Sequence, residues 1–312
     1  MMDFFFKRAL LLGCCLALQV IGVHAAAAIK ETILLEVAEP VYGSKPVPVE
    51  LWTPDSGKNS YPLIIVQHGS TRDGHEFEGG KGQTDVYASR LMKAAIDRGF
   101  AVAALDAFFD KGIAPSDKTK FPNAAMYGVK IRMHLLSTHS QLDPAQTFYT
   151  GFSYGGDQAL AQLASRNTTP WRAVAAAEAG CNSFFKPRVL SYPVLIVKGS
   201  ESHYHPRACQ TMATLHQQMG NEVHVSMIDK ANHFFSFHGE IVKGLAFNGC
   251  ASNPVVVDDS AGQMTFLDGT PTTKEDVFAR CFTKQSGKGQ TREKLDEAIT
   301  QILDFFSAQL HL

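Results

Sequence analysis

The stretch TGFSYGGDQAL, residues 150–160, places Ser153 between glycines in the pattern Gly-x-Ser-x-Gly. The residues before the serine, 146–152, are β-like, and those after it have helical periodicity. Such a loosely specified pattern also arises by chance, in which case Ser153 is an ordinary turn serine. The alternative is a strained strand-to-helix turn that lifts the serine hydroxyl above the edge of a sheet. The surrounding chain has to decide between these interpretations.

Strand-like and helix-like segments alternate on both sides of this turn. Two β-rich segments, 32–40 and 47–55, come first, and further strands are predicted at 61–69, 100–109, 146–152, 171–180, 192–200 and 221–229. Helical periodicity is present at 84–99, 123–140, 153–166, 206–220 and 292–310. This alternation predicts an α/β fold, with a mostly parallel central sheet and helices on both faces.

One segment interrupts the alternation. Residues 246–288 are polar and glycine-rich and carry two cysteines. Turn residues separate two short β-like runs within 253–269, which predicts a hairpin there. We interpret 246–288 as an insertion between the last strand and the closing helix, within one domain that spans residues 26–312.

The composition limits the class of protein. The chain has 312 residues, of which 45% are hydrophobic and 19% charged, and its formal net charge is -1. This is a globular composition without the basic excess that nucleic-acid or anionic-membrane partners require. We expect no cofactor, and the sequence does not determine the oligomeric state.

The N-terminus has the pattern of a secretory signal peptide. Lys7 and Arg8 precede an apolar run over residues 9–23, and a small-residue cleavage site ends at Ala25. The run is shorter than a bilayer span requires, so we expect cleavage of residues 1–25 and a periplasmic or secreted protein with no membrane anchor. The alternative is lipoprotein processing at Cys14, which ends the segment LLGC.

Four cysteines remain after this cleavage: Cys181, Cys209, Cys250 and Cys281. An even number in an exported protein suggests two disulfides, with three possible connectivities. Our hypothesis pairs Cys181 with Cys209, which would tie the loop after the 171–180 strand to the 206–220 helix. It pairs Cys250 with Cys281, which would close the polar insertion. The alternative is four free thiols.

Side chains that follow the predicted strands indicate catalysis by the serine. Ligands bind at the carboxyl ends of parallel strands. At these ends lie Ser153, the carboxylates Glu178 and Glu201, and His233. Their chain order of serine, acid and histidine is that of α/β-hydrolases, in which the histidine takes the serine proton and the carboxylate orients the histidine. The oxyanion formed on attack needs two N–H donors, which we expect from Tyr154 and from Ser70 or Gly69.

The motifs resemble the dienelactone hydrolase branch of the α/β-hydrolases, especially its exported members. The matching pieces are VQHGS at 66–70, RGFAVAALDAFFDKGI at 98–113, GFSYGGDQAL at 151–160, AGC at 179–181, VLIVKGS at 194–200, PRACQ at 206–210 and ANHFF at 231–235, together with the cysteine-bearing insertion. The resemblance covers roughly the whole mature chain. It implies a single-domain hydrolase with Ser153 as nucleophile and His233 as base. True dienelactone hydrolases use cysteine, so serine here implies a more general esterase.

The acid departs from the pattern of this family. Where the family has an aspartate, three residues after the glycine that ends the 192–200 strand, this chain has Ser202. We therefore expect Glu201, one position earlier, to orient His233, with Glu178 as the alternative acid. A histidine metal site formed by His203, His205, His233 and His238 is a weaker interpretation, and we expect no metal.

Taken together, these residues predict an exported serine hydrolase that acts on small ester or lactone substrates through an acyl-enzyme. The missing family aspartate suggests the alternative, a catalytically degenerate α/β-hydrolase fold that binds a ligand without turnover.

Overall fold

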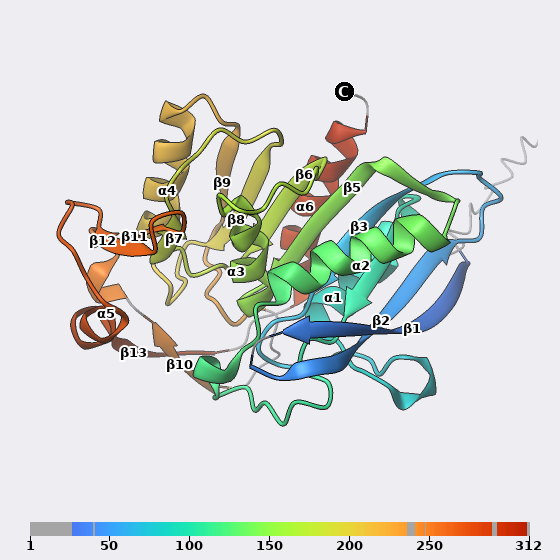
Figure 1. The fold of residues 1–312 in the computed structure, drawn as a ribbon, viewed down its shortest axis with the longest axis horizontal. Helices are drawn as coiled ribbons and strands as arrows, with labels where there is room; N and C mark the ends of the chain where they lie inside the picture. The colour runs from blue at the N-terminus through green and yellow to red at the C-terminus, as the bar shows by residue number, and fades with distance from the viewer. Residues whose placement is uncertain (1–26, 40, 236–240, 247, 289–291, 311–312) are drawn as a thin grey trace, which may run out of the picture.

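The apolar runs form neighbouring strands of one eight-stranded sheet, ordered β1-β2-β4-β3-β5-β6-β8-β9 (Figure 1). The computed structural model describes residues 27–39, 41–235, 241–246, 248–288 and 292–310, so the predicted signal peptide with Cys14 lies outside the described residues. The strands are β1 (Ala28–Glu39), β2 (Gly43–Pro54), β3 (Tyr61–Gln67), β4 (Ala101–Leu105), β5 (Leu142–Phe152), β6 (Ala173–Ala177), β8 (Val194–Gly199) and β9 (Val223–Ile228). Strand β2 pairs antiparallel with β1 and β4, and all other pairs are parallel.

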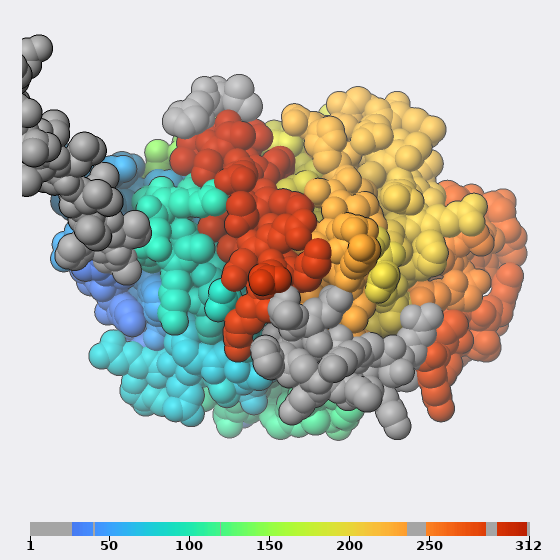
Figure 2. Space-filling view, turned by 180° about the vertical axis from the view of Figure 1, so that it is seen from behind, coloured from blue at the N-terminus to red at the C-terminus, as the bar shows by residue number. Residues whose placement is uncertain are grey.

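Helices cover both faces of this sheet. The helices are α1 (Val86–Asp97), α2 (Ala124–Thr138), α3 (Tyr154–Leu160), α4 (Pro206–Gln218) and α6 (Arg292–Gln309). Buried side chains of α1 and α6 share one core cluster with the sheet, and those of α2, α3 and α4 share the cluster on the opposite face. Figure 2 shows the first face, where the red residues of α6 lie beside the teal residues of α1. The predicted α/β architecture is therefore correct.

The inner strands β3, β4, β6 and β8 of the parallel part are buried on both faces, which explains their largely apolar sequences. Strand β3 is an example, because Leu63, Ile64, Ile65 and Val66 have no exposed surface. Successive side chains of a strand point to opposite faces, and Leu63 and Ile65 accordingly lie in one core cluster while Ile64 and Val66 lie in the other.

The segment after β9 builds a small lobe at one end of the sheet (Figure 1). It contains β10 (Ile241–Ala246), β11 (Val255–Asp258), β12 (Gln263–Phe266), α5 (Lys274–Cys281) and β13 (Thr283–Lys288). The hairpin expected within 253–269 is the β11–β12 pair. Strand β11 also pairs in parallel with β7 (Ser183–Phe185), a short strand that the sequence patterns did not predict.

Two disulfides have the predicted pairings. Cys181 is bonded to Cys209 and Cys250 to Cys281. The first joins the loop after β6 to α4, and the second lies inside the small lobe, in a cluster with Val255. Among the helices of the described residues, none combines the length and apolar character needed to cross a membrane.

Candidate active site

Ser153 sits at a strained turn between β5 and α3. Its backbone adopts φ 54° and ψ -113°, in a region that side-chain-bearing residues rarely occupy. The Ser153 N–H donates to the carbonyl of Ala177 at 2.9 Å, which holds the turn against β6. The strain is characteristic of a strand–turn–helix that presents a nucleophile.

The two glycines of the motif allow this turn to pack. A Cβ on Gly151 would lie 2.5 Å from backbone atoms of Gly155, and a Cβ on Gly155 would lie 2.2 Å from the carbonyl oxygen of Gln67. Both distances are shorter than real Cβ contacts, and the obstructing atoms are backbone. The glycines are therefore required for β3, β5 and the start of α3 to approach one another.

His233 faces the serine from the loop after β9. Its Nε2 lies 3.0 Å from the Ser153 Oγ, and its side chain is almost fully buried. The ring packs against Phe152, with centroids 5.7 Å apart. The structure thus brings together the serine and the histidine that the sequence singled out.

The carboxylate at the histidine is Glu178, the alternative acid of the sequence analysis. Its Oε2 lies 2.8 Å from His233 Nδ1. Because the carboxylate accepts the Nδ1 hydrogen, Nε2 is left with a lone pair toward Ser153. Glu178 immediately follows β6 and has a positive φ of 55°, a second strained residue near the turn.

Glu201, the acid first expected, lies elsewhere. Its backbone N–H donates to the carbonyl of Ala231 at 2.8 Å, and its side chain is exposed. The next residue, Ser202, turns inward and donates its hydroxyl to Glu178 Oε2 at 2.6 Å. Ser202 therefore occupies the position at which the resemblance expects an aspartate. Instead of supplying a carboxylate, it donates a hydrogen bond to the carboxylate of Glu178, which follows the adjacent strand β6.

The surroundings of Glu178 favour its ionised form. Burial raises the pKa of this carboxyl, but the nearby Lys198 ammonium and hydrogen bonds from His233 and Ser202 outweigh it and lower the pKa to about 2. Burial lowers the pKa of His233 below its ordinary value, and the contact with Glu178 opposes this shift without cancelling it. The pair therefore holds an ionised carboxylate beside a neutral imidazole at neutral pH.

The three residues expected to supply oxyanion donors differ in whether their N–H group already has an acceptor and in whether they line the cavity. The Gly69 N–H already donates to Asp85 Oδ2 at 2.6 Å, so it is committed to that carboxylate. Ser70 and Tyr154 line the same cavity as Ser153. Tyr154 is the first residue of α3, where a backbone N–H has no acceptor within its own helix. The geometry therefore favours Tyr154 and Ser70 over Gly69.

A cavity of about 500 Å³ opens beside Ser153. Its apolar lining comes mainly from α3, β7, α4 and the segment before α2, and includes Phe121, Pro122, Leu160, Leu163, Phe184, Phe185 and Met212. Polar groups also line it, among them Lys118, whose Nζ donates to the hydroxyl of Tyr204 at 2.7 Å. The sequence analysis missed the contribution of β7, because its place in the wall depends on pairing with the distant β11.

No metal-binding group is found in the part of the chain that the structure describes. His203 stacks on Phe234, with centroids 4.8 Å apart. His205 caps α4 by accepting the N–H of Arg207. His238, the fourth histidine of that interpretation, lies outside the described residues.

Comparisons with known proteins bear on the fold. No protein-family model matches the chain, and no curated protein matches it. Among solved structures, a dienelactone hydrolase-like promiscuous phosphotriesterase from metagenomic libraries has a TM-score of 0.56 at 14% identity, over 90% of this chain and 98% of its own.

Two further neighbours are more distant. Esterase 2 of Thermogutta terrifontis has a TM-score of 0.50 at 13% identity, over 66% of this chain and 86% of its own. Dipeptidyl peptidase 4 of Porphyromonas gingivalis has a TM-score of 0.50 at 15% identity, over 67% of this chain and 33% of its own. The chain therefore has the α/β-hydrolase fold, and its structural neighbours include dienelactone hydrolase-like proteins and related esterases.

Proposed function

We propose that this protein is a serine hydrolase that cleaves carboxylic esters of small acyl or lactone substrates through a Ser153–His233–Glu178 triad. The observation that carries the proposal is the continuous hydrogen-bonded chain of Ser153 Oγ, His233 and Glu178 beside a largely apolar cavity. A structural serine would not require a strained backbone, a neutral histidine and a buried ionised carboxylate in series.

The reaction begins with attack by Ser153 Oγ on the carbonyl carbon of the substrate, while His233 Nε2 takes the hydroxyl proton. Glu178 holds the ring through Nδ1 and stabilises the imidazolium that forms. The oxygen of the tetrahedral intermediate carries a negative charge, for which the N–H groups of Tyr154 and Ser70 are the proposed donors.

Collapse of the intermediate breaks the bond to the alcohol, which leaves with the proton held by His233. In a lactone the alcohol remains part of the acyl chain. Water then gives its proton to His233 and attacks the acyl-enzyme, and a second collapse releases the acid and restores Ser153. No redox or group-transfer partner is needed, so the proposal includes no cofactor.

The alternative, a fold that binds without turnover, was suggested by the missing family aspartate. Glu178 supplies a carboxylate to the same histidine nitrogen, so this reason for the alternative falls away. Export is part of the proposal, because the N-terminal pattern predicts a signal peptide and two disulfides are compatible with an oxidising compartment.

A hydrolysis screen tests the proposed activity. We expect the mature protein, residues 26–312, to hydrolyse p-nitrophenyl esters of short and medium chain length or small lactones. Ser153→Ala and His233→Ala should each abolish this turnover while the circular dichroism spectrum stays unchanged. Turnover by Ser153→Ala above a tenth of the parent value would contradict the assignment of the nucleophile.

A further inference from the structure

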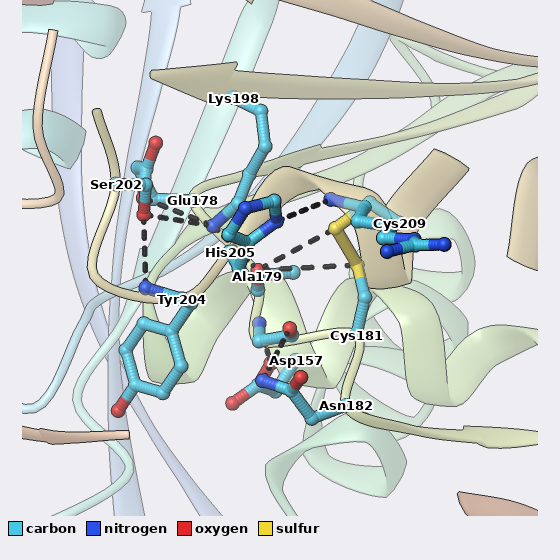
Figure 3. Close-up of a disulfide and its surroundings, with 12 residues drawn as sticks. Asp157, Glu178, Ala179, Cys181, Asn182, Lys198, Ser202, Tyr204, His205 and Cys209 are labelled. Carbon is cyan, nitrogen blue, oxygen red and sulfur yellow. Dashed lines mark hydrogen bonds and ion pairs between the residues drawn. A yellow bond between two sulfur atoms is a disulfide. The ribbon is translucent and has the colours of Figure 1, made fainter. Parts of the chain in front are cut away.

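Lys198 places a second ionisable group inside the site. Burial lowers the pKa of its ammonium group, and the Glu178 and Asp157 carboxylates oppose this shift. It belongs to β8, within the apolar run VLIVKG, and has no exposed surface. Its Nζ lies 3.1 Å from Glu178 Oε2, 2.9 Å from the carbonyl oxygen of Ala179 and 3.2 Å from Ser202 Oγ (Figure 3). The ammonium group therefore has one acceptor for each of its three hydrogens.

A buried ion pair of this kind is poorly explained by stability alone. Two charges lose their hydration on burial, and an apolar pair of similar volume often stabilises a protein equally well or better. Lys198 is nevertheless paired with Glu178, the carboxylate that contacts His233. This points to a role for the lysine in the action of the triad.

Lys198 and its strand end hold Glu178 from several sides. Glu178 Oε1 accepts the N–H of Gly199 at 2.5 Å, while Oε2 accepts from Lys198, Ser202 and His233. The same ammonium group also contacts Ala179, the residue after Glu178. These contacts fix the direction of the Glu178 carboxylate, whose backbone is held at a positive φ.

Resting on the proposed function, we propose that Lys198 is a positioning residue of the triad, whose ammonium group keeps the Glu178 carboxylate ionised and directed at His233 Nδ1. It also balances the charge of the site, because one buried positive group neutralises one buried negative group. The carboxylate of Glu178 thus depends on the positive charge of Lys198 in β8.

The charges around His233 set the sign of the expected effect. Glu178 raises the pKa of His233, and the Lys198 and Lys118 ammonium groups lower it. Among the described residues, the other titratable neighbours are His203 and Tyr204, with ring centroids 4.5 Å and 4.8 Å from that of His233. Burial lowers the pKa of His203 to about 3 and raises the pKa of Tyr204, so both are neutral at the working pH.

Removal of the Lys198 charge should therefore raise the pKa of His233. Lys198 Nζ and His233 Nδ1 each lie within about 3 Å of the same Glu178 oxygen, hence within about 6 Å of one another. At the effective dielectric constant of about 20 that suits buried groups, one such charge shifts a pKa by ~1–2 units.

The test is the pH dependence of fluorophosphonate labelling at Ser153, which needs no identified substrate. In Lys198→Met we expect the acid limb of the second-order rate constant to move up by ~1–2 pH units, so that labelling at pH values below the limb of the parent is ~10–100-fold slower. Ser202→Ala is the matched control, because it removes a donor to Glu178 and no charge. It should slow labelling without moving the limb.

A folded Lys198→Met protein with the acid limb and rate of the parent would overturn the inference. If that variant does not fold, ¹⁵N NMR of the lysine side chains in the parent protein decides. An ammonium at Lys198 throughout the active pH range supports the inference, and a neutral amine at pH 7 overturns it. Failure of the parent to label at Ser153 would instead refute the proposed function, and the NMR result would still report the charge of Lys198.

Discussion

Replacement of Glu178 by glutamine should abolish nearly all activity while preserving the shape of the site. The carboxylate accepts hydrogen bonds at both oxygens: Oε1 from Gly199, and Oε2 from Lys198, Ser202 and His233. An amide has only one acceptor oxygen. Whichever way the glutamine amide turns, its NH₂ group therefore faces a donor.

Both orientations of this amide have a cost. With its oxygen toward His233, the NH₂ group opposes the Gly199 N–H. With its NH₂ group toward His233, it opposes the Lys198 ammonium, and the imidazole must carry its hydrogen on Nε2, where it can no longer accept the Ser153 proton. Loss of the correct tautomer lowers turnover by about 10⁴ in comparable triads. We expect a decrease of about 10³–10⁴ for Glu178→Gln.

The assay is the rate of hydrolysis of the best p-nitrophenyl ester, with Glu201→Gln as the matched control. The Glu201 side chain is exposed, and its backbone N–H donates to the carbonyl of Ala231. This control should retain the parent rate. A Glu178→Gln protein that is folded and retains more than a tenth of the parent rate would refute the reasoning, and a large loss in Glu201→Gln would return the acid to the loop after β8.

Three further predictions concern the scaffold. Gly155→Ala should destabilise the protein by about 1–3 kcal/mol in urea unfolding, because its Cβ meets the Gln67 carbonyl oxygen at 2.2 Å; unchanged stability would show that the turn is less tightly packed. Burial raises the pKa of Asp85 from 3.8 to about 7, so the folded state binds an extra proton between these values. The free energy of unfolding should therefore fall by up to about 4 kcal/mol as the pH rises from 4 to 7, and Asp85→Asn should remove this slope in urea titrations at several pH values. Replacing Cys181 and Cys209 together by alanine opens a disulfide with a sequence separation of 28 and should lower the free energy of unfolding by about 3–4 kcal/mol, measured without reductant; equal stability would argue against this disulfide in the folded protein.

The features that the sequence predicted best are those that local pattern determines. Largely apolar runs marked the inner parallel strands, since a strand that is buried on both faces has few polar positions. The glycines around Ser153 indicated the turn, because only glycine permits the backbone approaches seen there.

The position of the acid could not be predicted in the same way. Glu178 and Glu201 both follow strands, and which of them reaches His233 depends on how each loop turns. A hydrogen bond from the Glu201 N–H to Ala231 and a positive φ at Glu178 decide this, and neither is visible in the sequence. Lys198 was the available signal, because a lysine inside an apolar strand implies a buried carboxylate partner nearby.

The pairing of β7 with β11 was also missed. Both strands are short, and each contributes a few ladder hydrogen bonds between segments about 70 residues apart. Such pairing depends on where the small lobe docks. The cavity wall formed by Phe184 and Phe185 was therefore not predictable from local sequence.

The most direct test of the account is to map the site of fluorophosphonate attachment in the mature protein by peptide mass spectrometry. The chain provides an internal comparison in Ser89, whose Oγ lies 2.9 Å from His75 Nδ1, while His75 Nε2 lies 2.5 Å from Glu50. This second serine–histidine–glutamate chain is not among the residues that line the cavity beside Ser153. The account predicts a single label on Ser153 that Ser153→Ala and heat denaturation abolish and Ser89→Ala leaves in place. A folded protein that does not label, or a label that persists in Ser153→Ala, would contradict it.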